Sequence, residues 1–247
     1  MRFLSLPAIA YLLVLFYLPF LIVIFYSFGF PNEFTVGNYE IVTNPIFLKV
    51  FLNSLLIAAL TTVICLILAY PVAYYIALKS EKKNLLLMLV ILPFWINFLL
   101  RTYALMTILS PLGMMFTFQA VIIGMVYDYL PFMILPLYAS LEKINRSQLE
   151  ASYAFGATPL KTFLKVTLPL SKPGIVAGVI LVFVPSLGEF VVPAMLGGTV
   201  ATVGTLTWDL FLRYHDWWRG SALSVIYIAI VFFSLYLYIK RAGKLEL

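Results

Sequence analysis

The 247-residue sequence is poor in the residues on which metal sites and many enzymes depend. It contains one cysteine, Cys65, one histidine, His215, and only 11% charged residues. A single cysteine excludes an internal disulfide and a cysteine-based metal site, so we expect Cys65 to be a small buried apolar residue. No nucleophile motif lies near His215, and no His, Asp or Glu cluster has metal-ligand spacing. We therefore predict neither a catalytic residue nor a metal ligand.

Two longer patterns are also missing. No Gly-x-x-x-x-Gly-Lys-Ser/Thr loop, the motif that holds nucleotide phosphates, occurs in the chain. We therefore expect no nucleotide cofactor in this chain. The alternating segments of about ten residues that are typical of a transmembrane barrel are absent as well.

Apolar residues dominate what is present. The chain is 64% hydrophobic, with a mean hydropathy of +1.06, well outside the range of soluble domains. A helix needs about 20 mostly apolar residues to cross a bilayer. Six runs of this kind occur, at about residues 6–30, 47–78, 85–109, 118–141, 174–196 and 221–239. We predict an all-α, multi-pass membrane protein with one domain and six transmembrane helices.

The basic residues predict the orientation of the spans, because cytoplasmic loops retain Lys and Arg. An N-terminus inside the cell places 12 of the 16 Lys and Arg residues on the cytoplasmic side. They are Arg2, Lys79, Lys82, Lys83, Lys143, Arg146, Lys161, Lys165, Lys172, Lys240, Arg241 and Lys244. Both termini and the segment 142–173 are thus predicted to be cytoplasmic. The net charge of +6 then follows from topology and requires no nucleic acid partner.

The cytoplasmic segment 142–173 is polar and has signals for two short helices. Ser147 and Glu150 have the spacing of a capping box, which predicts a helix start at Ser147. Gly156 can adopt the left-handed conformation that ends a helix. The small residues between them leave a shallow surface on which another molecule can pack.

A second helix is predicted over Leu160–Val166. Thr158 and Pro159 are suited to its N-cap and first position, and Pro169 is expected to end it. From these residues alone, a docking element and an amphipathic hairpin on the lipid surface, with its lysines near anionic headgroups, are both consistent with the segment.

The spacing of this segment resembles the signature loop of permease subunits of binding-protein-dependent ABC importers. Ser152 and Val166 stand where the family pattern has alanine and isoleucine. The resemblance implies a MetI-like permease fold and a loop that docks in a groove of an ATPase subunit. The coupling residues that it implies are Glu150, Ala151, Ser152, Gly156, Ala157, Leu168 and Pro169.

Further blocks, at residues 92–95, 101–104, 127–138 and 187–198, look like the first permease of spermidine/putrescine importers. That resemblance implies a non-catalytic subunit of the bacterial inner membrane. Its partners would be a second permease, two ATP-binding subunits, an extracytoplasmic polyamine-binding protein and membrane lipid. An importer of phosphonate, iron or sulfate, an ion-coupled carrier and a membrane enzyme are the alternatives.

Arg101, Asp128 and Glu189 lie well inside predicted spans, where charge is costly. Either the acids line a path for a cation, or Arg101 pairs with one of them as a structural lock. Glu189, beside Gly188 and before Pro193, is expected to lie in an interrupted helix. Nearby aromatic residues could bind amines by cation–π contacts or merely lie at the membrane interface. They are Trp95, Tyr103, Tyr127 and Tyr129.

Overall fold

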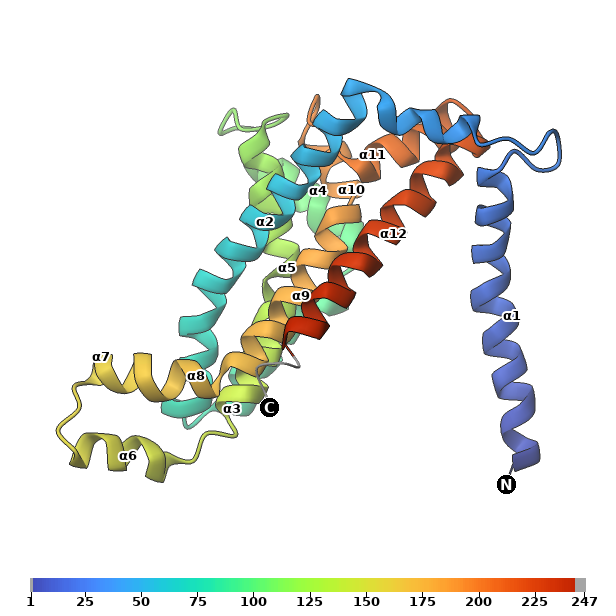
Figure 1. The fold of residues 1–247 in the computed structure, drawn as a ribbon. Helices are drawn as coiled ribbons and strands as arrows, with labels where there is room; N and C mark the ends of the chain where they lie inside the picture. The colour runs from blue at the N-terminus through green and yellow to red at the C-terminus, as the bar shows by residue number, and fades with distance from the viewer. Residues whose placement is uncertain (1, 243–247) are drawn as a thin grey trace. The chain divides into compact units, whose positions relative to one another are not determined.

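The computed structural model describes residues 2–242, which are helical and contain no strand (Figure 1). The described chain divides into two compact units. Residues 53–202 form one unit, and residues 2–52 with 203–242 form the other. The prediction of an all-α protein is confirmed for the described residues.

The unit formed by the two ends of the chain contains five helical elements and the start of α2. They are α1 (Arg2–Ser27), η1 (Gly37–Thr43), α11 (Val203–Trp208), the π-helical η5 (Asp209–Arg213) and α12 (Trp217–Ala242); α2 spans Pro45–Tyr74. Within this unit α1 contacts α12, and the indole nitrogen of Trp218 donates to the carbonyl oxygen of Phe30 at 3.2 Å. A small apolar core includes Phe47, Val50, Val203, Leu210 and Leu223.

The unit of residues 53–202 contains the rest of α2 and the elements that follow it. In order these are η2 (Tyr75–Lys79), α3 (Lys83–Ile91), η3 (Leu92–Trp95), α4 (Phe98–Leu109), α5 (Phe118–Leu141), α6 (Arg146–Ala154), α7 (Pro159–Thr162), η4 (Phe163–Thr167), α8 (Leu168–Leu170), α9 (Lys172–Gly188) and α10 (Val191–Leu196). α5 is central, because it contacts α3, α4, α9 and α10. Its buried residues include Met125, Met133 and Leu137, which belong to the main core.

Glycines allow α5 and α9 to approach closely. A Cβ atom on Gly174 would lie 2.6 Å from the carbonyl oxygen of Pro136, and one on Gly178 would lie 2.5 Å from the sulfur of Met133. Larger residues at these two positions would push the helices apart. The pair α5 and α9 therefore forms a tightly packed scaffold for the residues at its ends.

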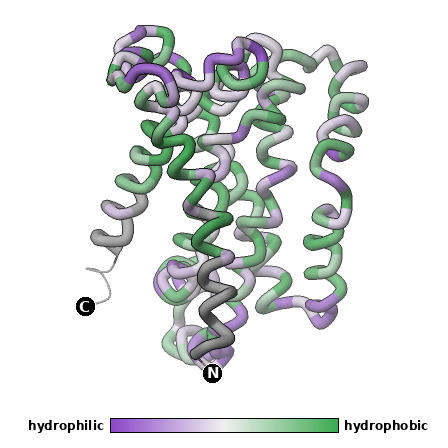
Figure 2. Tube along the Cα trace, turned by 90° about the vertical axis from the view of Figure 1, so that its right-hand side faces the viewer, coloured by the Kyte–Doolittle hydropathy of each residue, from purple (hydrophilic) through white to green (hydrophobic). Residues whose placement is uncertain are grey.

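Two stretches are long and apolar enough to cross a membrane as single helices, Pro45–Lys79 and Phe118–Leu141. Two bent pairs also qualify if each counts as one span: Lys83–Trp95 with Phe98–Leu109, and Pro159–Leu170 with Lys172–Gly188. In Figure 2 hydrophobic residues run along the helices, and hydrophilic residues gather in many of the segments that join them. Six spans and cytoplasmic termini stay predictions, and Lys244 lies outside the described residues.

Two of the predicted apolar runs are interrupted. The run 85–109 is divided between η3 and α4, and the helices on either side meet at 93°. The run 174–196 breaks after Gly188, where Glu189 is extended with φ −63° and ψ 130°, and α10 begins at Val191. The interruption expected at Glu189 is confirmed.

Candidate functional site

The hairpin of residues 146–170 contains the segment that resembles a coupling loop. Its first helix, α6, has Asn145 as N-cap, with the side-chain oxygen accepting from the backbone N–H of Ser147 at 3.1 Å. The predicted capping box at Ser147 is therefore wrong. Asn145 lies outside the helix with extended backbone angles, the conformation that an N-cap requires, and Ser147 is already inside the helix.

The end of α6 agrees with the prediction. Gly156 has φ +76°, and its N–H donates to the carbonyl oxygen of Tyr153 at 2.9 Å. The N–H of Ala157 donates to the carbonyl oxygen of Ser152 at 3.1 Å, so two carbonyls at the end of the helix are satisfied. The glycine turns the chain sharply toward the second arm of the hairpin.

The second arm begins as predicted but does not end at Pro169. The Thr158 hydroxyl accepts from the N–H of Lys161, and Pro159 follows it. Helical structure then continues through the π-helical η4 and α8 to Leu170, so the predicted stop at Pro169 is wrong. Proline lacks an N–H and crowds the preceding turn, and the wider π-turn lies directly before it.

The hairpin presents apolar side chains at its surface and is held together by hydroxyl groups. The side chain of Phe155, next to the turn, is 92% exposed, and Glu150, Ala151 and Pro169 are also exposed. Inside the hairpin, the hydroxyl oxygens of Ser152 and Thr162 lie 2.9 Å apart. Thr162 is buried, so this hydrogen bond joins the two arms.

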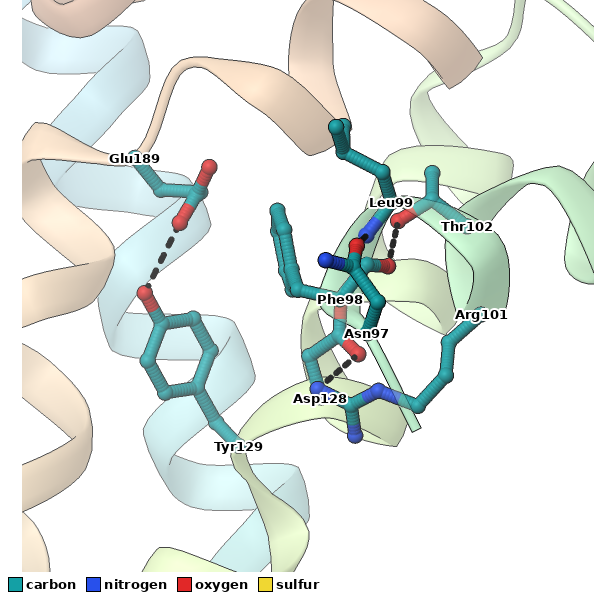
Figure 3. A network of polar contacts seen from close by, with 8 residues as sticks. All are labelled: Asn97, Phe98, Leu99, Arg101, Thr102, Asp128, Tyr129 and Glu189. Carbon is teal, nitrogen blue, oxygen red and sulfur yellow. Dashed lines mark hydrogen bonds and ion pairs between the residues drawn. The ribbon is translucent and has the colours of Figure 1, made fainter. Parts of the chain in front are cut away.

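The first interrupted run is capped by Asn97. Its side-chain oxygen accepts from the N–H of Leu99 at 2.9 Å (Figure 3). Its carbonyl oxygen accepts from the N–H of Arg101 at 3.1 Å. These bonds start α4 directly after the 93° bend. Sequence reasoning missed Asn97, although a proline with an asparagine four positions after it, within an apolar run, was a readable signal.

One turn further along α4, Arg101 forms a buried ion pair with Asp128 of α5. The guanidinium nitrogen Nη2 lies 3.2 Å from the carboxylate oxygen Oδ1, and the two side chains are 7% and 5% exposed (Figure 3). The guanidinium carbon lies 5.9 Å from the ring centre of Phe98 and 5.8 Å from that of Tyr127. Two opposite charges thus cancel inside the packed unit.

Glu189 is held at the second break by neutral groups. One carboxylate oxygen accepts from the N–H of Val191 at 2.8 Å, and the other accepts from the hydroxyl of Tyr129 at 3.0 Å (Figure 3). Its carbonyl oxygen accepts from the hydroxyl of Thr202. Glu189 is half-buried and forms no ion pair with any residue in the described range. The negative charge is therefore stabilised without being cancelled.

The predicted aromatic residues differ in their exposure. The side chains of Trp95, Tyr103 and Tyr127 are 72%, 58% and 44% exposed, whereas Tyr129 is buried at 9%. Tyr127 lines an apolar groove of about 600 Å³ together with three prolines, Pro71, Pro93 and Pro131. The site thus joins two helix breaks to consecutive residues of α5, and the rings of Phe98 and Tyr127 lie beside its ion pair.

Comparison with known proteins shows the family. The model of the family described as binding-protein-dependent transport system inner membrane component matches residues 66–242. The chain belongs to this family. It is a permease subunit of an ABC importer, and it is a membrane component of transport rather than an enzyme.

Two relatives and one solved structure extend the match over nearly the whole chain. The spermidine/putrescine transport system permease protein PotB of Salmonella typhimurium is 38% identical, covering 96% of this chain and 91% of that protein. PotB of Haemophilus influenzae is 40% identical over 88% of this chain and 82% of its own length. A crystal structure of a bacterial ABC transporter that imports the acidic polysaccharide alginate matches with a TM-score of 0.70 at 16% identity, covering 97% and 94% of the two chains. The MetI-like permease fold is thereby confirmed.

Proposed function

We propose that this chain is a permease subunit of an ATP-driven importer of polyamines in the bacterial inner membrane. The observation that carries the substrate class is the similarity to spermidine/putrescine permeases over 96% of the chain. Six spans with both termini in the cytoplasm agree with the distribution of Lys and Arg.

The proposed assembly has three kinds of protein partner besides membrane lipid. A second permease completes the pathway, two ATPase subunits bind ATP and Mg, and an extracytoplasmic binding protein delivers the polyamine. The hairpin docks on an ATPase through its exposed turn, where Phe155 is 92% exposed. The residues assigned to this contact are Glu150, Ala151, Ser152, Gly156, Ala157, Leu168 and Pro169. Movement of the ATPases would then switch the spans between inward-open and outward-facing states.

Within the pathway, Glu189 is the proposed contact for a substrate amine. Its charge is not cancelled by a described cation, and its half-buried position strengthens attraction to an ammonium group. The exposed rings of Trp95, Tyr103 and Tyr127 can offer cation–π contacts to the same substrate. The Arg101–Asp128 pair braces α4 against α5, and Tyr129 positions the Glu189 carboxylate.

Uptake of labelled spermidine and putrescine by the reconstituted complex tests this function. Glu189→Gln keeps an oxygen that can accept from Val191 but removes the charge, and we expect uptake to fall by about tenfold or more, the equivalent of losing about 1.4 kcal/mol. Glu40→Gln, in η1, is the matched control and should transport normally. Normal polyamine uptake by Glu189→Gln would remove this carboxylate from its role, and no uptake by wild type would reject the substrate class.

A further inference from the structure

The second arm of the hairpin is attached to α2 by aromatic rings. The ring of Phe163, the first residue of the π-turn η4, contacts Tyr70 edge to face, with 5.5 Å between ring centres and an interplanar angle of 85°. It also contacts Tyr74 at 6.3 Å and 75°. Tyr70 and Tyr74 are one turn apart on α2 and therefore share a face of that helix. The phenylalanine thus rests against both tyrosines.

Tyr70 makes a second, polar attachment at the end of the hairpin. Its hydroxyl oxygen lies 2.7 Å from the hydroxyl oxygen of Ser171, which is fully buried. The Ser171 hydroxyl donates its proton to the carbonyl oxygen of Leu168 at 3.1 Å. Because a hydroxyl has a single proton and that of Ser171 is directed to Leu168, we assign Tyr70 as the donor of the bond between the two hydroxyls.

Ser171 lies at the bend between the hairpin and α9. The helical stretch Pro159–Leu170 and the helix Lys172–Gly188 meet there at 64°. α9 then runs without interruption to Gly188, and Glu189 follows it. The Tyr70 side chain therefore contacts the hairpin at Phe163 and the bend at Ser171, and the bend begins the helix that ends at the proposed substrate contact.

We propose that Tyr70 is a positioning residue that links movement of the hairpin to movement of α9. With the bend held on α2, displacement of the hairpin turns α2 and α9 together. Without the hydroxyl contact, the hairpin moves on its own while α9 stays in place. An apolar groove of about 480 Å³ lies beside these rings, so side chains do not fill all the space around the hairpin. Its lining includes Tyr70, Tyr74, Phe163 and Leu168. This inference rests on the proposed function, in which an ATPase displaces the hairpin.

Two tyrosine variants provide a matched test. Tyr70→Phe keeps the ring contact with Phe163 and removes only the hydrogen bond to Ser171. Tyr74→Phe removes a hydroxyl that has no hydrogen-bond partner among the described residues, and it also keeps its ring contact. Ser171→Ala removes the same bond from its other side, together with the bond to the Leu168 carbonyl oxygen that Tyr70→Phe retains.

The measurements are ATPase co-purification, ATP hydrolysis and spermidine uptake by the reconstituted complex, with uptake expressed per ATP hydrolysed. We expect Tyr70→Phe and Ser171→Ala to bind the ATPase and hydrolyse ATP normally while uptake per ATP falls about fivefold, the factor that one hydrogen bond contributes to an equilibrium. The double variant should show no further loss, and Tyr74→Phe should behave as wild type. Unchanged uptake per ATP in Tyr70→Phe, or an equal fall in Tyr74→Phe, would overturn the inference. If wild type fails to retain an ATPase, the proposed function itself fails, and the inference with it.

Discussion

The two helix breaks flanking α5 are built alike but differ in charge. At each break a side-chain oxygen accepts a hydrogen bond from the N–H two residues further on. The Asn97 side chain accepts from Leu99, and the Glu189 side chain accepts from Val191. Each break is tied to one of two consecutive residues of α5, Asp128 or Tyr129. The first has a neutral cap and a cancelled ion pair, whereas the second keeps a carboxylate without a described counter-ion. The same backbone geometry therefore serves rigidity at one break and, in our proposal, attraction of a cation at the other.

Removing the positive charge that pairs with Asp128 at the first break has the largest expected effect on the stability of the subunit. Arg101→Met leaves Asp128 buried and unpaired, which we expect to destabilise the subunit by about 3–5 kcal/mol. Thermal unfolding of the detergent-solubilised complex measures this loss. Arg101→Met combined with Asp128→Leu should recover most of it, because no charge is then left without a partner. A double variant as unstable as the single one would contradict a simple charge-pair explanation.

Overpacking the contact of α5 with α4 and α10, one turn before Asp128, has a smaller expected effect. A Cβ atom on Gly124 would lie 2.6 Å from a methyl carbon of Leu196 and 2.7 Å from one of Val192, both in α10, and 3.6 Å from Leu105 of α4. Gly124→Val should therefore cost about 1–3 kcal/mol by displacing these buried side chains. Thermal unfolding, with the exposed Ala104→Val on α4 as control, checks this. Equal stability of the two variants would show that the contact is easily relieved.

The smallest expected effect comes from removing the helix cap at the first break, a change that leaves every charge in place. Asn97→Ala removes the cap of α4 and should cost about 1 kcal/mol. Because the residue carries no charge, we expect spermidine uptake by the folded fraction to remain near wild type, in contrast to Glu189→Gln. Circular dichroism melting and uptake on the same preparation measure the two quantities. Loss of uptake with normal stability would place Asn97 in the pathway and erase the distinction between the breaks.

Local signals in the sequence predicted part of this site. The helix Phe118–Leu141 has the bounds expected from hydropathy, and Gly188 with Pro193 indicated the break at Glu189. The left-handed conformation of Gly156 was also predictable, because a glycine directly after a short helix commonly ends the helix in this conformation. These features depend on residues close together in the chain.

Features that depend on distant or competing residues were not predictable. Asn145 and Ser147 are both good caps two positions apart, and only the folded backbone decides between them. The sequence left the partner of Arg101 open, since Asp128 and Glu189 were equally available, and the packing of α4 on α5 selects Asp128. The contact of Phe163 with Tyr70 joins segments 93 positions apart, and no local pattern announces it.

The lone cysteine has a practical consequence. Cys65 is fully buried in α2, and its sulfur lies 3.7 Å from the carbonyl oxygen of Val126. Maleimide reagents should therefore leave the folded subunit unlabelled. A thiol introduced at the outermost side chain of the hairpin, Phe155→Cys, would then be the one reactive position in this subunit. A fluorophore there would follow the hairpin through a transport cycle without prior replacement of the native Cys65.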